Sequence, residues 1–89
     1  MLYRKSIFEK NGKFKFVLLE QQPDRDPRLC ESAESSSALD MSVTTIEVFW
    51  SRIRKPTEQD YLAQRDQLER DGWMFRVEQL DELPIAIQL

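Results

Sequence analysis

The sequence IFEKNGKFKF, residues 7–16, is the stretch that decides the fold. Its centre, Asn11-Gly12, favours a type I′ turn, because both central residues of that turn need positive φ angles. The flanking runs Leu2–Lys10 and Lys13–Glu20 carry apolar and aromatic residues in the pattern of strands. They predict an antiparallel hairpin in which Lys10 faces Lys13, Glu9 faces Phe14, Phe8 faces Lys15 and Ile7 faces Phe16.

The second half of the chain predicts a strand, a helix and another strand. Residues 43–53 are rich in β-branched and aromatic side chains and contain neither Gly nor Pro, which is typical of a strand. Thr57 followed by Asp60 approximates a capping box, and Gly72 is placed to end the helix in a left-handed conformation. Trp73–Leu80 predicts a further strand. We therefore expect a small α+β fold, with a mostly antiparallel sheet carrying one helix on one face.

Residues 21–42 show no regular pattern between these two halves. Pro23 and Pro27 interrupt strand pairing, and Glu31–Asp40 is a stretch of Ser, Glu and Ala with little to bury. We expect a long, acidic and mobile loop here, within a single domain that spans residues 1–89. Residues 85–89 alternate in hydrophobicity, so they predict a short final strand or a docked tail.

The composition argues against an enzyme. Among the 89 residues there is no histidine, one cysteine (Cys30) and only two glycines. The usual general base and metal ligand is thus missing, a Cys-rich metal site and an internal disulfide are excluded, and no Gly-rich phosphate loop is present. The acidic residues of the loop lack the spacing of a calcium loop. We expect no catalytic residue, no cofactor and no metal.

The lengths of the apolar runs, the N-terminal sequence and the single cysteine predict a cytoplasmic protein that does not enter a membrane. The net charge is −3, and the longest unbroken apolar run, Phe16–Leu19, is four residues, far short of the roughly 20 that a membrane span needs. The N-terminus resembles no signal peptide, and a single cysteine is typical of a reducing compartment.

The alternation of side chains along the strands sorts them into two faces of the sheet. We expect the helix to cover an almost wholly apolar face, which consists of Ile7, Phe14, Phe16, Leu18, Ile46, Val48, Trp50, Trp73, Phe75 and Val77. The opposite face would then carry Arg4, Phe8, Lys15, Val17, Leu19, Glu47, Phe49, Ile53, Met74, Arg76, Glu78 and Leu80.

That opposite face is more apolar than a solvated antiparallel sheet should be, because seven of its twelve residues are apolar. Either the tail and loop residues such as Leu29, Leu39 and Met41 cover it, or another protein or a second copy of the chain does, and a ligand pocket is a further alternative. Large exposed apolar patches on small proteins mark interaction sites. The leading hypothesis is a small regulatory protein-interaction module (an adaptor, assembly factor or inhibitor) that docks through this face and the acidic loop. The predicted partner-binding residues are Arg4, Phe8, Lys15, Val17, Leu19, Phe49, Ile53, Met74 and Arg76.

Single-stranded nucleic acid is the alternative partner for the same face. Arg4, Lys15 and Arg76 lie there beside Phe8 and Phe49, and such modules stack bases on aromatic rings while cations hold the phosphates.

A second basic group, Arg52, Arg54 and Lys55, follows the strand that contains Trp50. It could hold a phosphate or carboxylate at the start of the helix. The alternative is local pairing with Glu58 and Asp60.

One stretch invites comparison with a known family. Between Val48 and Leu80, the order of a strand, Ser51-Arg52-Ile53, a helix, Gly72 and a strand resembles the small linker domain of cyanobacterial light-harvesting antennae. The chain departs from that family in having one glycine after the helix instead of two, and in being acidic where those linkers are basic. We therefore carry no function over from this resemblance.

Overall fold

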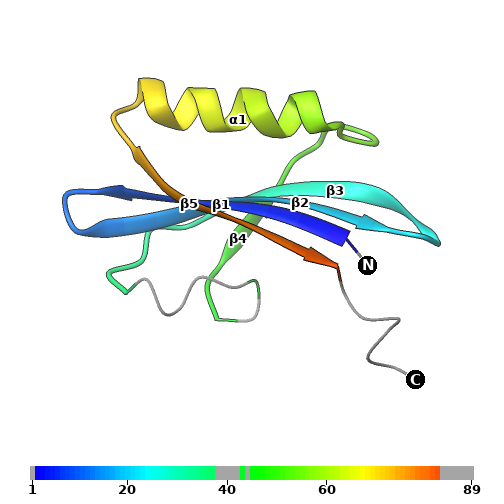
Figure 1. Cartoon of the computed structure of the whole chain (residues 1–89), viewed down its shortest axis with the longest axis horizontal. Coiled ribbons are helices and arrows are strands. Elements are labelled where there is room, and N and C mark those ends of the chain that lie inside the picture. The colour runs from blue at the N-terminus through cyan, green and yellow to red at the C-terminus, as the bar shows by residue number, and fades with distance from the viewer. Residues whose placement is uncertain (1, 38–42, 44, 83–89) are drawn as a thin grey trace.

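The computed structural model describes residues 2–37, 43 and 45–82. Its elements are β1 (Leu2–Lys10), β2 (Lys13–Gln22), β3 (Arg25–Ser32), β4 (Val48–Trp50), α1 (Glu58–Arg70) and β5 (Met74–Glu82). The strands form one antiparallel sheet in the order β4-β3-β2-β1-β5, and α1 packs on one face of it (Figure 1). The expected small α+β fold is confirmed.

The hairpin at residues 7–16 has the predicted register. β1 and β2 pair so that Lys10 faces Lys13 and Ile7 faces Phe16. The turn residues Asn11 and Gly12 have φ angles of 51° and 76°, which lie in the left-handed region that a type I′ turn requires. The dipeptide therefore sets the pairing of the two central strands.

Replacing Gly12 with Ala is expected to lower the free energy of unfolding by about 1 kcal/mol, because a Cβ disfavours positive φ. A Cβ at this position would meet no atom within 4 Å, so the cost is conformational and not steric. Urea denaturation followed by circular dichroism measures it. The control is Asn11→Gly, which should be neutral or slightly stabilising. A Gly12→Ala variant as stable as the parent would contradict the type I′ assignment.

The expected loop over residues 21–42 is wrong for its first half. β2 continues to Gln22, and Arg25–Ser32 forms β3, which pairs with β2. The prolines are accommodated because Pro23 falls in the turn between these strands and Pro27 falls where the register shifts between Glu20 and Gln22. Proline is tolerated in sheets at such irregular positions.

The strand expected over residues 43–53 is shorter than predicted, since β4, which pairs with β3, spans only Val48–Trp50 of the described residues in this range. Leu39, Met41 and the tail residues 85–89, proposed as internal cover, lie outside the described residues. No helix in the described part of the chain is both long and apolar enough to cross a membrane.

Helix α1 begins and ends where its capping residues predict. The Thr57 side chain accepts a hydrogen bond from the backbone N–H of Asp60, whose carboxylate accepts one from the backbone N–H of Thr57. Gly72 follows the helix with φ 94°. Tyr61 and Leu68 are the buried residues of the helix, so they fix which side of it packs on the sheet.

The face assignment drawn from strand alternation is wrong for the central strands. The core beneath α1 consists of Phe8, Val17, Leu19, Leu29, Tyr61, Leu68 and Trp73. Ile7, Phe16, Leu18 and Cys30, three of which were expected under the helix, form a second core on the other face, with Tyr3, Phe14, Ile46 and Val48 packed against it.

A bulge in the β1–β5 pairing explains part of this difference. Ile7 pairs with Val77, whereas Phe8 pairs with Phe75, so one extra residue of β5 lies between these pairs. The bulge breaks the alternation that had placed Trp73, Phe75 and Val77 on one face. Phe75 meets Phe8 edge to face on the helix side, with ring centroids 5.8 Å apart.

Candidate functional site

Five of the nine predicted partner-binding residues lie under the helix or bond to groups that do. Phe8, Val17 and Leu19 are at most 3% exposed and belong to the core beneath α1. Arg4 and Lys15 are engaged in ion pairs on the same face. The expectation that this set forms an open docking face opposite the helix is therefore wrong.

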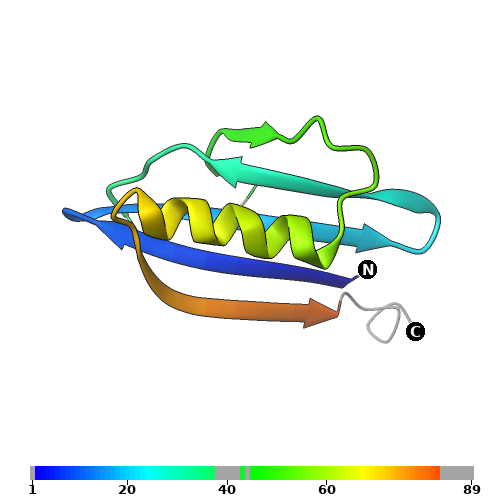
Figure 2. The same cartoon turned by 90° about the horizontal axis from the view of Figure 1, so that it is seen from above.

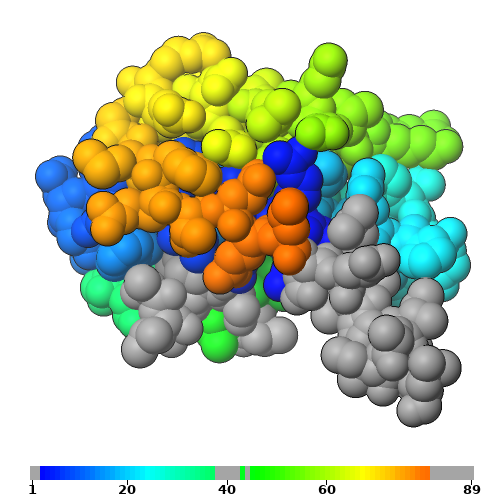
Figure 3. Space-filling model, viewed as in Figure 1, coloured from blue at the N-terminus to red at the C-terminus, as the bar shows by residue number. Residues whose placement is uncertain are grey.

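The other four predicted residues are separated onto the two edges of the sheet. Phe49 lies on β4, and Ile53 follows that strand closely. Met74 and Arg76 lie on β5, the opposite edge strand, which is at the surface of the molecule (Figure 3, orange). There they border a hollow of about 370 Å³ near the β1–β2 turn. The four residues cannot form one surface, so each edge is a separate candidate.

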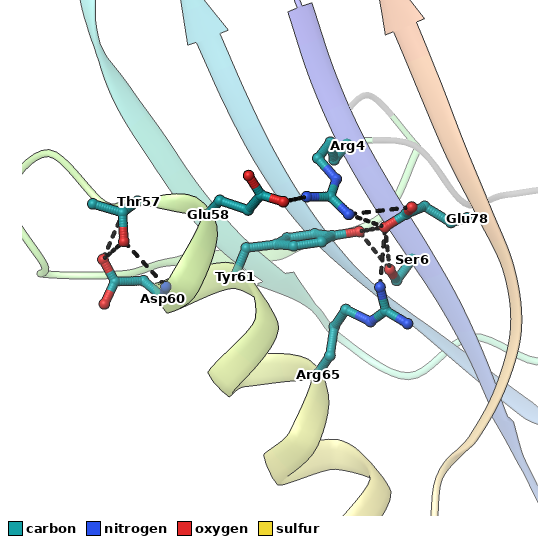
Figure 4. Close-up of polar contacts among 8 residues, drawn as sticks. All are labelled: Arg4, Ser6, Thr57, Glu58, Asp60, Tyr61, Arg65 and Glu78. Carbon is teal, nitrogen blue, oxygen red and sulfur yellow. Dashed lines mark hydrogen bonds and ion pairs between the residues drawn. The ribbon is translucent and has the colours of Figure 1, made fainter.

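A cluster centred on Glu78 joins α1 to β1 and β5 (Figure 4). Oε2 of Glu78 accepts hydrogen bonds from the Tyr61 hydroxyl at 2.8 Å, from Nη1 of Arg65 at 3.0 Å and from Nη2 of Arg4 at 3.1 Å. Ser6 bonds to the same tyrosine hydroxyl. Tyr61 and Ser6 are fully buried, and the side chains of Arg4, Arg65 and Glu78 are each less than one quarter exposed. The bonds are therefore shielded from water.

The electrostatics of this cluster favour a charged Glu78 and a neutral Tyr61. Burial alone would raise the pKa of Glu78, but the Tyr61 hydrogen bond and the charges of Arg4 and Arg65 lower it. Burial, the largest cause, raises the pKa of Tyr61 to about 12, and its bond to Ser6 opposes this. The Glu78 carboxylate accepts several hydrogen bonds at once, and the protonated Tyr61 hydroxyl donates one of them. Such a network acts as a structural clamp, which holds the helix on the sheet.

Lys15 is held on the helix face by a second polar group. It pairs with Glu31, which also accepts a hydrogen bond from Gln64 of α1. The Lys15 ammonium lies 5.4 Å from the ring centroid of Trp73, within the range of a cation–π contact. These contacts engage Lys15 within the fold, whereas the sequence predicted it as a partner-binding residue.

The exposed apolar and basic groups gather around β4. Phe49, Trp50 and Ile53 are 57%, 40% and 48% exposed, and the exposed cations that follow β4 are Arg52, Arg54 and Lys55. We call these six residues the β4 patch. The sequence-based site included Phe49 and Ile53 but omitted Trp50 and the three cations, although the cations had been noted separately as an anion-binding group.

The predicted local neutralisation of these cations is absent from residues 2–37, 43 and 45–82. Glu58 pairs with Arg4, and Asp60 caps the helix through Thr57. No salt bridge joins Arg52, Arg54 or Lys55 to a carboxylate of the described residues. The three positive charges are therefore available to an external acidic group.

A groove of about 330 Å³ lies beside the β4 patch. It is lined by Leu29, Cys30, Glu31, Phe49, Ser51 and Gln64, and so it runs between α1 and strands β3 and β4. Helix α1 lies over the middle of the sheet and leaves β4 uncovered at one edge (Figure 2). Its lining combines apolar Leu29 and Phe49 with polar Glu31, Ser51 and Gln64.

Trp50 is held in place although it is exposed. The Arg28 guanidinium carbon lies 4.0 Å from the centroid of its ring, and Arg28 donates two hydrogen bonds to Glu20 at 2.6 and 3.0 Å. An aromatic side chain fixed in this way loses little conformational entropy when a partner packs on it.

The Cys30 thiol is expected to stay unreactive in the folded protein. It is 1% exposed, and burial raises its pKa to about 12, so little thiolate is present at neutral pH. We expect Ellman's reagent at pH 8 to label Cys30 only as fast as the protein unfolds. Labelling that outpaces unfolding measured by circular dichroism would contradict this burial.

The described residues hold no group of three His, Cys, Asp or Glu side chains arranged to bind a metal ion. Comparisons with family models, with curated proteins and with solved structures find no match for this chain.

Proposed function

We propose that this chain is a non-catalytic protein-interaction module that binds an acidic partner through the β4 patch. One observation carries the proposal. Three exposed apolar side chains lie at one edge of the sheet, next to three cations that have no carboxylate partner in the described chain. The module would act by bridging or occluding its partner, in the cytoplasm, where Cys30 remains a free thiol.

The residue types of the β4 patch support this function. Protein interfaces are enriched in aromatic residues and Arg, and these residues dominate their binding energy. Because the whole chain has a net charge of −3, a local group of three cations also steers an acidic partner to this edge and away from the rest of the surface.

The test compares two triple charge reversals. Random 12-residue peptides on phage are selected against the parent chain, and the recovered peptides are expected to be acidic. Their binding, followed by tryptophan fluorescence, should weaken at least ~10-fold in the variant Arg52→Glu, Arg54→Glu, Lys55→Glu. The control reverses three other exposed charges that form no salt bridge in the described chain, namely Lys13, Arg25 and Arg70.

Equal weakening in both variants would show only a dependence on net charge and would contradict a site at the β4 patch. Recovery of no acidic peptide would contradict the proposed function itself.

A second candidate function is the binding of single-stranded nucleic acid by the same patch. Phe49 and Trp50 could stack on bases while the cations contact phosphates, as in other single-strand binders. Tight binding of a 12-nucleotide oligothymidine that weakens steeply with salt would favour this function over the first.

A further inference from the structure

The open edge of β4 carries backbone groups without partners among the described residues. The N–H of Ser51 donates to the carbonyl of Leu29 at 2.7 Å, and the N–H of Ala33 donates to the carbonyl of Glu47 at 2.9 Å. Successive residues of an antiparallel strand direct these groups to opposite sides. The N–H and C=O groups of Val48 and Trp50 therefore point away from β3, and no described strand lies on that side.

We propose that the β4 edge takes up an extended acidic segment of the partner as an additional antiparallel strand. This inference rests on the proposed function and names its binding mode. Strand addition would satisfy the outward groups of Val48 and Trp50 with main-chain hydrogen bonds. Antiparallel pairing is favoured because it is slightly more stable for each residue than parallel pairing.

The alternation of side chains then specifies the partner segment. The residue opposite Phe49 shares its face of the sheet, so its side chain packs beside the exposed Phe49 ring, next to the groove that this ring lines. An apolar side chain suits this position. The residues on either side of it lie on the opposite face, next to Trp50 and Val48.

The charges specify the direction of the segment. β4 leads directly into Arg52, Arg54 and Lys55. In an antiparallel partner, the residues that face this end of β4 are the N-terminal ones. The preferred ligand therefore has acidic residues at its N-terminus, followed by a β-rich stretch with one apolar anchor.

The other sheet edge is less suited to strand addition, although β5 is longer. A bulge interrupts its pairing with β1, and the exposed Arg76 lies on it. Both features discourage the addition of another strand. Glu78 of the same strand is bound by Tyr61, Arg4 and Arg65, so it cannot rearrange to meet a partner without breaking the clamp.

The experiment uses a synthetic peptide of three Asp residues followed by Val, Leu, Val, Thr and Val. Its binding to the full chain is measured by calorimetry, and the same peptide of reversed sequence order is compared. Two further peptides carry methyl groups on alternate backbone nitrogens. In one peptide these are the nitrogens expected to face β4, and in the other they are the nitrogens expected to point away from β4. Methylation in the frame that faces β4 should weaken binding at least ~10-fold, because main-chain bonds are lost, whereas methylation in the outward frame should have little effect.

Amide hydrogen exchange provides the second readout. On binding, exchange of the Val48 and Trp50 amides should slow at least ~10-fold, and the reversed peptide should bind more weakly. If both methylated peptides bind equally and these amides are not protected, strand addition is wrong. The proposed function would still stand if binding of the peptide is weakened by the Arg52→Glu, Arg54→Glu, Lys55→Glu variant.

Two other outcomes would also overturn the inference. If the peptide fails to bind and phage selection recovers no acidic sequence, the proposed function fails together with the binding mode. If, without peptide, the Val48 and Trp50 amides are protected in concentrated protein but not in dilute protein, a second copy of the chain occupies the edge in place of an acidic partner.

Discussion

Replacing Phe8 with Ala is expected to lower the free energy of unfolding by about 4 kcal/mol. The Phe8 side chain is fully buried beneath α1, packs with the other residues of that core and meets the Phe75 ring edge to face. Truncation loses this buried area and leaves a cavity between the helix and the sheet. Because small domains are stable by only about 5–15 kcal/mol, the loss should be visible as an early urea transition. Circular dichroism measures it.

Phe49→Ala is the matched control, since it makes the same chemical change at a side chain that is 57% exposed. It should change the free energy of unfolding by less than about 0.5 kcal/mol and should instead weaken binding of acidic peptides. A Phe8→Ala variant that keeps its stability and loses only binding would support the docking face expected from the sequence, and would contradict the core described above.

Replacing Glu78 with Gln should destabilise the fold by about 2 kcal/mol at neutral pH. The neutral side chain no longer compensates the charges of Arg4 and Arg65, whose side chains are 24% and 18% exposed, and it weakens the bond from Tyr61. The partial exposure of these groups places the cost below that of a fully buried ion pair. Urea denaturation between pH 3 and pH 8 measures the difference from the parent.

The pH dependence of this difference has a definite sign. The pKa of Glu78 is lowered in the folded state, because the Tyr61 hydrogen bond and the two arginines outweigh the effect of burial. Its stabilising contribution is therefore fully present above the ordinary carboxyl pKa of 4.5 and is lost as the pH falls through the folded-state value. The parent and Glu78→Gln should converge in stability in acid.

Glu69→Gln serves as the control for this prediction. Glu69 is exposed in the last turn of α1, and its carboxylate forms no ion pair with a described residue, so this change should cost less than about 0.5 kcal/mol at any pH. A constant difference between the parent and Glu78→Gln from pH 3 to pH 8 would show that Glu78 acts through packing and not through its charge.

Local sequence signals predicted the elements that depend on neighbouring residues alone. Asn11-Gly12 determined the hairpin register, because few residue pairs adopt two successive positive φ angles. Thr57, Asp60 and Gly72 determined where α1 begins and ends, because capping bonds satisfy backbone groups within one turn. The same local reasoning missed β3, since it treated Pro27 as a break in pairing, whereas Pro27 lies at a register shift, where a proline is tolerated in a sheet.

The site depended on contacts between distant residues, and there the sequence alone was insufficient. Alternation separates the side chains of β1 and β2 into two sets, but both sets contain large apolar residues, so it cannot say which one the helix covers. The folded chain places the set that contains Phe8 beneath the helix, where Glu78, Tyr61 and Arg4 also come together.

The β4 patch shows the same division. The sequence by itself determined that three cations follow a strand rich in aromatic residues. Only the tertiary structure decided that these cations stay unpaired in the described chain, because Arg4, 54 positions away along the chain, binds Glu58, and the helix cap engages Asp60. Short-range patterns thus determined the hairpin turn and the limits of the helix, while long-range charge pairing decided which cations remain open to a partner.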